Sequence, residues 1–253
     1  MGNSKAAATI RNVNLRKRFA DFPSVSAKRL EGSLFALRFR KRVGRGITMF
    51  SIHEEMKVLS QKHPFFSSKE ALKDALKFQL QEKFRVMNNK HFHGYVVDLW
   101  VEDPNGGQQY AIYLMNKLAR LAIKQNNQSI ELKHHGAQDI GRYDFLKQVE
   151  KLEKLATGRE NVQGIAILLT NDHLYWSKPT RSNTVDSYFR IHENSILTGE
   201  LKWLEHASAG TTKNREEPIV LKGMYKMQWH HYSTVRNEKH GEFRYLAVYV
   251  GVD

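Results

Sequence analysis

The feature that most constrains the fold of this chain is a pair of apolar segments joined by a short turn. Residues 95–101 read YVVDLWV and residues 110–115 read YAIYLM, and both are rich in β-branched and aromatic side chains. The DPNGG sequence at 103–107 supplies a proline that fixes φ, together with asparagine and glycine residues that accept positive φ. The sequence therefore predicts a β-hairpin of two buried strands.

One acidic residue, Asp98, lies inside the first of these strands. Burying a carboxylate without a partner is strongly unfavourable, so this group needs a metal ion, a cationic side chain or a backbone N–H group beside it. Asp98 is therefore the first candidate for a functional site.

Hydrophobic periodicity predicts helices on either side of the hairpin. Apolar side chains recur at every fourth position from Leu72 to Phe84, which marks one face of an amphipathic helix. Ser67 and Glu70 precede this face with the spacing of a capping box, in which Ser67 is the N-cap. The same periodicity predicts two further helices, over residues 49–63 and 141–155.

Further apolar runs complete the expected sheet. Residues 162–170, VQGIAILLT, are the most apolar run in the chain and fit a fully buried central strand. Residues 116–125 fit either a short helix or a basic connector without regular structure. The other predicted strands cover residues 129–133, 197–204, 219–229 and 243–250. The last three of these suggest a small antiparallel layer that extends the main sheet.

The order of helices and strands predicts a mixed α/β fold, with a mixed central sheet flanked by helices. We expect a basic N-terminal segment at 1–48 and an α/β core at 49–176. Residues 177–253 are expected to form a C-terminal antiparallel β extension of the same domain.

Net charge indicates the class of partner. The chain has 253 residues and a formal net charge of +14, which is typical of proteins that bind a polyanion such as nucleic acid. A basic protein without such a partner is the alternative. Basic residues interleaved with phenylalanines in 1–48 fit either a phosphate-binding groove or an ordinary solvated face. The basic cluster in this segment is Arg38, Arg40, Lys41 and Arg42.

Composition also bears on the compartment. The chain contains no cysteine, which excludes disulfides and thiolate metal sites and fits a reducing environment. No apolar run approaches the length of a membrane span, and the first residues lack the apolar core of a signal peptide. We therefore expect an intracellular, cytoplasmic protein that does not enter a membrane.

Residues 131–146, ELKHHGAQDIGRYDFL, resemble a segment that recurs in uncharacterised prokaryotic members of the PD-(D/E)XK nuclease superfamily. The resemblance covers about residues 70–250 and includes the order of the elements and the Asp in the first strand of the hairpin. It implies a restriction-endonuclease-like fold, DNA rather than RNA as the partner, and Mg²⁺ as the cofactor of an active member. It also implies that Gln138 and Tyr143 contact the nucleic-acid backbone, and Arg142 adds a positive group to this binding site. The alternative is a structural role, in which Asp139 caps the helix and Tyr143 packs in the core.

The chain departs from the family pattern in the return strand of the hairpin. Tyr113 and Met115 stand where the family carries the Glu and Lys of its E-x-K pair. Mg²⁺ is a hard cation that prefers carboxylate oxygens, and neither a phenol nor a thioether replaces them. The departure predicts a pseudo-nuclease: a DNA-binding protein with a degenerate catalytic motif, weak or inactive in catalysis, which acts with protein partners in a larger complex.

A second E-x-K sequence offers an alternative. Glu131 and Lys133 fall on the same face of a predicted strand, because alternate side chains of a strand point the same way. If that strand lies beside Asp98, then Asp98 and Glu131 hold the metal and Lys133 orients the attacking water. The protein is then an active Mg²⁺-dependent deoxyribonuclease with a displaced site.

Overall fold

The computed structural model describes residues 50–251, except for 93, 126–127 and 238. The described residues belong to one compact unit, so the expected core and the expected C-terminal extension belong together. The expected basic segment at 1–48, with Arg38, Arg40, Lys41 and Arg42, lies outside the described residues.

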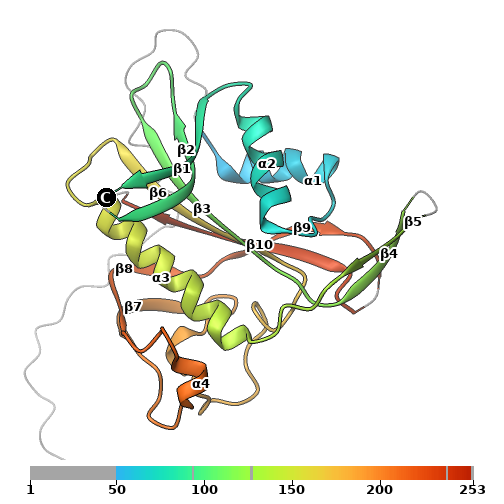
Figure 1. Ribbon diagram of the computed structural model, residues 1–253, viewed down its shortest axis with the longest axis vertical. Coiled ribbons are helices and arrows are strands. Elements are labelled where there is room, and N and C mark those ends of the chain that lie inside the picture. Colours follow the sequence, from blue (N-terminus) through green and yellow to red (C-terminus); the bar gives the residue numbers. More distant parts are fainter. Residues whose placement is uncertain (1–49, 93, 126–127, 238, 252–253) are drawn as a thin grey trace, which may run out of the picture. The chain divides into compact units, whose positions relative to one another are not determined.

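A six-stranded mixed sheet forms the centre of the unit, in the order β1-β2-β3-β6-β10-β9 (Figure 1). Strands β3 and β6 run parallel, and every other neighbouring pair in this sheet is antiparallel. The predicted hairpin is β2–β3 and the predicted central strand is β6, so both are confirmed. The strands are β1 (Arg85–Phe92), β2 (Tyr95–Glu102), β3 (Gln109–Lys117), β6 (Val162–Thr170), β9 (Trp229–Thr234) and β10 (Glu242–Val250).

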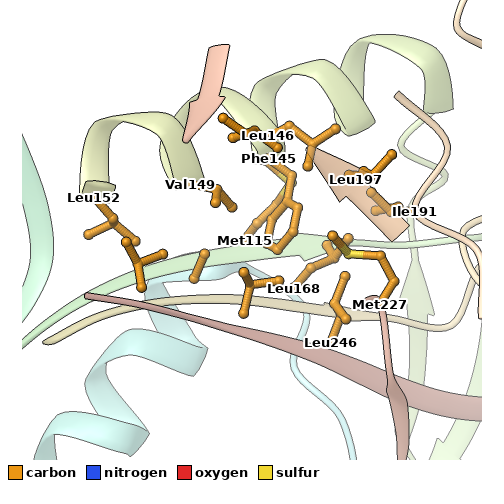
Figure 2. Packing of buried hydrophobic residues seen from close by; sticks show 14 of the residues in the cluster. Met115, Phe145, Leu146, Val149, Leu152, Leu168, Ile191, Leu197, Met227 and Leu246 are labelled. Atoms are coloured by element: carbon orange, nitrogen blue, oxygen red, sulfur yellow. The ribbon is translucent and has the colours of Figure 1, made fainter. Parts of the chain in front are cut away.

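Helices cover both faces of this sheet. Figure 2 shows α3 on one side of the strands, and Figure 1 shows α1 and α2 on the other. The bounds of these helices are α1 (Ile52–Lys62), α2 (Lys69–Leu80) and α3 (Gln138–Ala156). The predicted mixed α/β class, with a central sheet between helices, is therefore confirmed.

The hydrophobic core has two halves, separated by the sheet. On the α3 side, Leu146, Val149 and Leu152 pack toward the strands, next to Met115 of β3 (Figure 2). Each fully buried aliphatic side chain of this kind contributes about 1.5–3 kcal/mol. Strand β6 serves both halves, since its alternate residues belong to the two different clusters. This double burial explains why its sequence is continuously apolar rather than alternating.

The predicted start of α2 is wrong by one residue. The N-cap is Ser68, whose hydroxyl accepts a hydrogen bond of 3.1 Å from the backbone N–H of Ala71. Ser67 is therefore not the N-cap, and Glu70 does not stand at the third helical position that a capping box requires. The helix also ends at Leu80, earlier than the apolar repeat up to Phe84 predicted.

Two strands fall where the sequence predicted other structure. Strand β1 begins directly after the apolar repeat that ends at Phe84, where no strand was predicted, and β4 occupies part of the segment read as a helix or connector. Strand β4 pairs with β5 in a separate two-stranded sheet, and β5 matches the predicted strand at 129–133 within a residue. These strands are β4 (Leu121–Gln125) and β5 (Gln128–Leu132).

The C-terminal part divides between two sheets. The predicted strand at 219–229 is broken into β8 and β9, and only β9 and β10 join the main sheet. Strand β7 pairs with β8 in a second two-stranded sheet. The expected single antiparallel layer is therefore wrong in part. The remaining elements are η1 (Ser187–Phe189), β7 (Ile196–Leu201), α4 (Ala209–Thr212) and β8 (Ile219–Lys226).

Within the described part of the chain, every helix is too short or too polar to cross a bilayer.

Candidate functional site: a cationic cleft beside Asp98

The Asp98 carboxylate is buried and has two protein partners. Its Oδ1 lies 2.8 Å from Nζ of Lys69, and its Oδ2 accepts a hydrogen bond of 2.8 Å from the backbone N–H of Leu114. The sequence predicted that Asp98 needs a metal ion, a cationic side chain or a backbone N–H group beside it. The structure places a cationic side chain and a backbone N–H group there.

Local structure explains both contacts. The ladder between β2 and β3 runs from Glu102 and Gln109 to Leu99 and Ile112. Asp98 lies one residue beyond the end of this ladder, and its side chain accepts the hydrogen bond of the Leu114 N–H. Lys69 is the first residue of α2, so the N-cap that starts the helix also fixes the root of the Lys69 side chain.

Tyr113 completes this cluster. The Lys69 ammonium lies 4.7 Å from the centroid of the Tyr113 ring, a cation–π distance. Burial raises the pKa of the Tyr113 hydroxyl, and the negative charges of Asp98 and Asp144 raise it further. Tyr113 therefore remains a neutral phenol, and the cluster of Lys69, Asp98 and Tyr113 carries no net charge.

A cleft of about 680 Å³ opens on the α3 side of β3. Tyr113, Met115 and Lys117 form its floor, since alternation along the strand puts these three side chains on one face. Its walls come from α3 and from the segment before β8. The cationic side chains that line it are Lys69, Lys117, Lys147, Lys151 and Arg215.

Some of these cations are neutralised within the protein. Arg215 makes two hydrogen bonds to the carboxylate of Asp144, of 2.7 and 3.0 Å, and Lys147 pairs with Glu150 at 2.9 Å. Lys117 and Lys151 have no carboxylate partner in the part of the chain that the structure describes. Their ammonium groups are the cations of the cleft that remain available to an anionic ligand.

Lys117 was not predicted as a site residue. It lies two residues beyond Met115 on the same face of β3, so the period-two alternation that linked Tyr113 to Met115 also reaches it. Lys151 lies on α3, two helical turns beyond Asp144. It lines the cleft because α3 packs across β3, and the sequence alone does not show that packing.

The displaced site of Asp98, Glu131 and Lys133 is not assembled. Glu131 lies on β5 in the separate β4–β5 hairpin (Figure 1), where its exposed carboxylate pairs with Arg120 at 2.7 Å. Lys133 is also exposed, just beyond the end of β5. Neither residue lines the cleft or contacts the Asp98 carboxylate.

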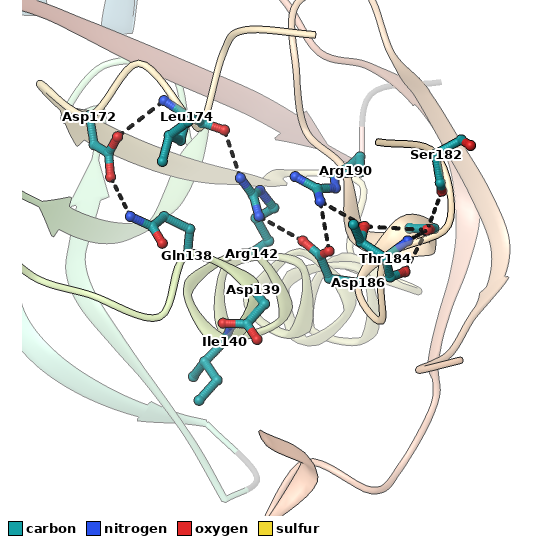
Figure 3. A network of polar contacts seen from close by, with 11 residues as sticks. Gln138, Asp139, Ile140, Arg142, Asp172, Leu174, Ser182, Thr184, Asp186 and Arg190 are labelled. Atoms are coloured by element: carbon teal, nitrogen blue, oxygen red, sulfur yellow. Dashed lines mark hydrogen bonds and ion pairs between the residues drawn. The ribbon is translucent and has the colours of Figure 1, made fainter. Parts of the chain in front are cut away.

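The three residues expected to contact a nucleic-acid backbone are engaged inside the protein. Arg142 is 4% exposed and donates to Oδ2 of Asp186 and to the backbone oxygen of Leu174, both at 2.6 Å (Figure 3). Gln138 Nε2 donates to Oδ2 of Asp172 at 2.8 Å, as the same figure shows. This arrangement replaces the expected contact role of Arg142 and Gln138 with a structural one.

Tyr143 is likewise held by its neighbours. Its hydroxyl donates a hydrogen bond of 2.7 Å to the backbone oxygen of Glu217, and its ring stacks on Trp203 with 5.5 Å between centroids. Although the residue lines the cleft, only 3% of its surface is exposed. Tyr143 shapes the wall of the cleft and joins α3 to the segment before β8.

Comparisons of the chain with protein-family models, with curated protein sequences and with solved structures found no match.

Proposed function

We propose that this protein binds nucleic acid, DNA in preference to RNA, through the cationic cleft beside Asp98, and that it does not hydrolyse the phosphodiester backbone. The observation that carries the proposal is the position of Lys69. Its ammonium group neutralises the carboxylate that a nuclease of the PD-(D/E)XK type would use for Mg²⁺.

The arrangement of the fold supports a distant place in that superfamily. A helix, a three-stranded antiparallel meander, a second helix and a strand parallel to the third occur in this order as α2, β1–β3, α3 and β6, with the β4–β5 hairpin inserted between β3 and α3. We propose a restriction-endonuclease-like core on this order, together with the resemblance of residues 131–146. The preference for DNA rests on that resemblance.

The chemistry of the cleft supports binding rather than catalysis. Tyr113 and Met115 present a neutral phenol and a thioether on its floor, and both are poor ligands for Mg²⁺. Lys117 and Lys151 offer ammonium groups to phosphate oxygens, and each neutralised phosphate releases counterions. A cleft that attracts a phosphate backbone but lacks a metal centre has the chemistry of a pseudo-nuclease.

The proposal is tested with a double substitution, Lys117→Gln/Lys151→Gln, and a fluorescently labelled duplex DNA. Binding is measured by fluorescence anisotropy at several salt concentrations. We expect weaker binding and a slope of log K against log[salt] that is smaller by about 2, since each lysine contributes about 1. The matched control is Lys57→Gln/Lys62→Gln, which removes the same charge from exposed positions on α1. Equal losses in the two double variants would contradict binding in the cleft.

Catalysis is tested separately with duplex DNA and Mg²⁺. We expect no cleavage by the unmodified protein. Metal-dependent cleavage that disappears in Asp98→Asn would refute the pseudo-nuclease proposal and establish an active deoxyribonuclease in its place.

A further inference from the structure

A second group of chemically active side chains lies outside the cleft. Asp172, His173 and His240 each place one potential ligand atom within 4.8 Å of the others. None of the three lines the cleft beside Asp98. We propose that these residues form a binding site for a divalent first-row transition metal, with Zn²⁺ as the ion that fits its donor set.

The topology brings the three residues together from distant parts of the chain. Asp172 and His173 follow the end of β6, and His240 lies in the turn between β9 and β10. Strands β6 and β10 are antiparallel neighbours, with Thr170 opposite Arg244, so the end of one meets the start of the other. The site would therefore join the end of one strand of the main sheet to the start of its neighbour.

His240 is held in an orientation suited to metal binding. Its Nδ1 lies 3.3 Å from the backbone oxygen of Asn171, and a carbonyl oxygen can only accept a hydrogen bond. Nδ1 therefore carries the proton, which leaves Nε2 as the ring atom with a free lone pair. Metal-binding histidines commonly have this kind of carbonyl partner on the second nitrogen.

Asn171 fixes the same turn from inside the protein. It is 1% exposed, and its side-chain amide donates to the backbone oxygen of His240 at 2.8 Å and to that of Ala119 at 3.3 Å. His240 has a φ of 66°, in the left-handed region that non-glycine residues seldom occupy. The bond from Asn171 to its backbone helps to hold the residue in that conformation.

Asp172 is similarly oriented by its neighbours. It is 2% exposed, and Gln138 donates to its Oδ2 at 2.8 Å while the backbone N–H of Leu174 donates to its Oδ1 at 3.1 Å (Figure 3). Each carboxylate oxygen has a further lone pair after one such bond, so the group retains the capacity to bind a cation. Gln138 is then an outer partner of a metal ligand, of the kind that orients ligands in known sites.

The donor set selects the metal. Two imidazoles and one carboxylate suit Zn²⁺ and its first-row neighbours, whereas Mg²⁺ prefers oxygen ligands alone. Tetrahedral Zn²⁺ with bonds of about 2.0–2.1 Å places its ligand atoms about 3.3 Å apart, so any pair of atoms that now lies farther apart, up to 4.8 Å, must move closer. His173 is exposed and can rotate to close that distance, whereas Asp172 and His240 are held in place. Three protein ligands leave a fourth position for water or another ligand.

The experiment uses the untagged full chain with Zn²⁺ as the probe, and it does not depend on nucleic acid. We expect one tightly bound Zn²⁺ per chain by isothermal titration calorimetry and a higher melting temperature with Zn²⁺ but not with Mg²⁺. Co²⁺ bound at the same site is expected to show the visible absorption of tetrahedral coordination.

Variants separate this site from other histidines. His173→Ala and His240→Asn are expected to abolish the tight binding, and Asn is chosen because it tolerates positive φ. Gln138→Ala is expected to weaken binding by about tenfold, since it removes only an outer partner. The matched control is His206→Ala, at an exposed position outside the group. The proposal is overturned if no saturable site is found, or if His173→Ala and His206→Ala bind Zn²⁺ equally well.

Discussion

Lys69 and Asp98 form an ion pair of 2.8 Å at the point where β2 and β3 stop pairing. The ammonium group comes from the first residue of α2, and the carboxylate comes from an otherwise apolar strand. The pair therefore links a helix start to the sheet and supplies the positive charge that Asp98 requires.

Removing the lysine alone should destabilise the protein. Lys69→Met leaves the buried Asp98 carboxylate with only the Leu114 N–H, and we expect a loss of about 1–3 kcal/mol in the free energy of unfolding. Lys69→Met/Asp98→Asn removes both charges and should recover most of that loss. Urea denaturation measures both values. A single variant as stable as the unmodified protein would show that the pair contributes nothing.

Arg142 is expected to be essential for stability. Both side chains of its ion pair with Asp186 are almost fully buried, and Arg142→Met would leave Asp186 paired, among the described residues, only with Arg190, at 2.9 Å, so we expect a cost of about 1.5–3 kcal/mol. Arg120→Met breaks the exposed pair with Glu131 and should cost at most about 1 kcal/mol. Urea unfolding midpoints compare the two, and similar losses would contradict the structural role assigned to Arg142.

Gly141 should not tolerate a larger side chain. A Cβ atom at this position would collide with the hydroxyl of Tyr175, which is buried and makes no hydrogen bond within the described part of the chain. We expect Gly141→Ala to cost about 1–3 kcal/mol by thermal or urea unfolding. Tyr175→Phe in the same chain removes the colliding oxygen and should restore much of the stability. Gly210→Ala, where the nearest atom lies 3.9 Å away, serves as the control.

Stability should fall in mild acid in part because of His53. Burial lowers the pKa of His53, the nearby His230 lowers it further, and Glu54 opposes the shift. In the unfolded chain, His53 takes up a proton as the pH falls through about 6.5, whereas in the folded protein it stays neutral to lower pH. The contribution of neutral His53 to the free energy of unfolding is therefore present above about pH 6.5 and is lost as the pH falls below it.

His53→Gln tests this relationship. Glutamine keeps a neutral partner for the hydroxyl of Tyr245, which lies 2.9 Å from Nδ1 of His53. Between about pH 7 and about pH 5 the variant should lose less stability than the unmodified protein, as measured by urea unfolding at each pH. If the variant and the unmodified protein lost the same free energy of unfolding between these two pH values, His53 would be excluded as a source of the acid sensitivity.

The sequence predicted those helices and strands whose own pattern of apolar residues indicates that they are buried. The hairpin β2–β3, the central strand β6 and the helix α3 all carry apolar patterns that need no knowledge of their partners. Strand β1, with the sequence RVMNNKHF, is largely polar and lies at an edge of the sheet, so its strand character depends on pairing with β2. The short strand β4 depends in the same way on β5.

The candidate site was predictable only in outline. The sequence identified Asp98 as a residue that needs a partner, but the partner proved to be Lys69, which reaches it through the packing of α2 on the sheet. Arg142 was misjudged because exposure is not visible in a helix sequence, and its partner Asp186 lies far along the chain. The resemblance had singled out Tyr113 and Met115, and both line the cleft, because strand alternation puts their side chains on one face of β3.

The position of β10 has a consequence for synthesis. This strand, Glu242–Val250, lies between β6 and β9 in the sheet, although it is synthesised after both of them. Until it emerges, β6 has a bare apolar edge of the kind that recruits other chains. A nascent polypeptide halted before this point would thus be exposed to aggregation or chaperone capture.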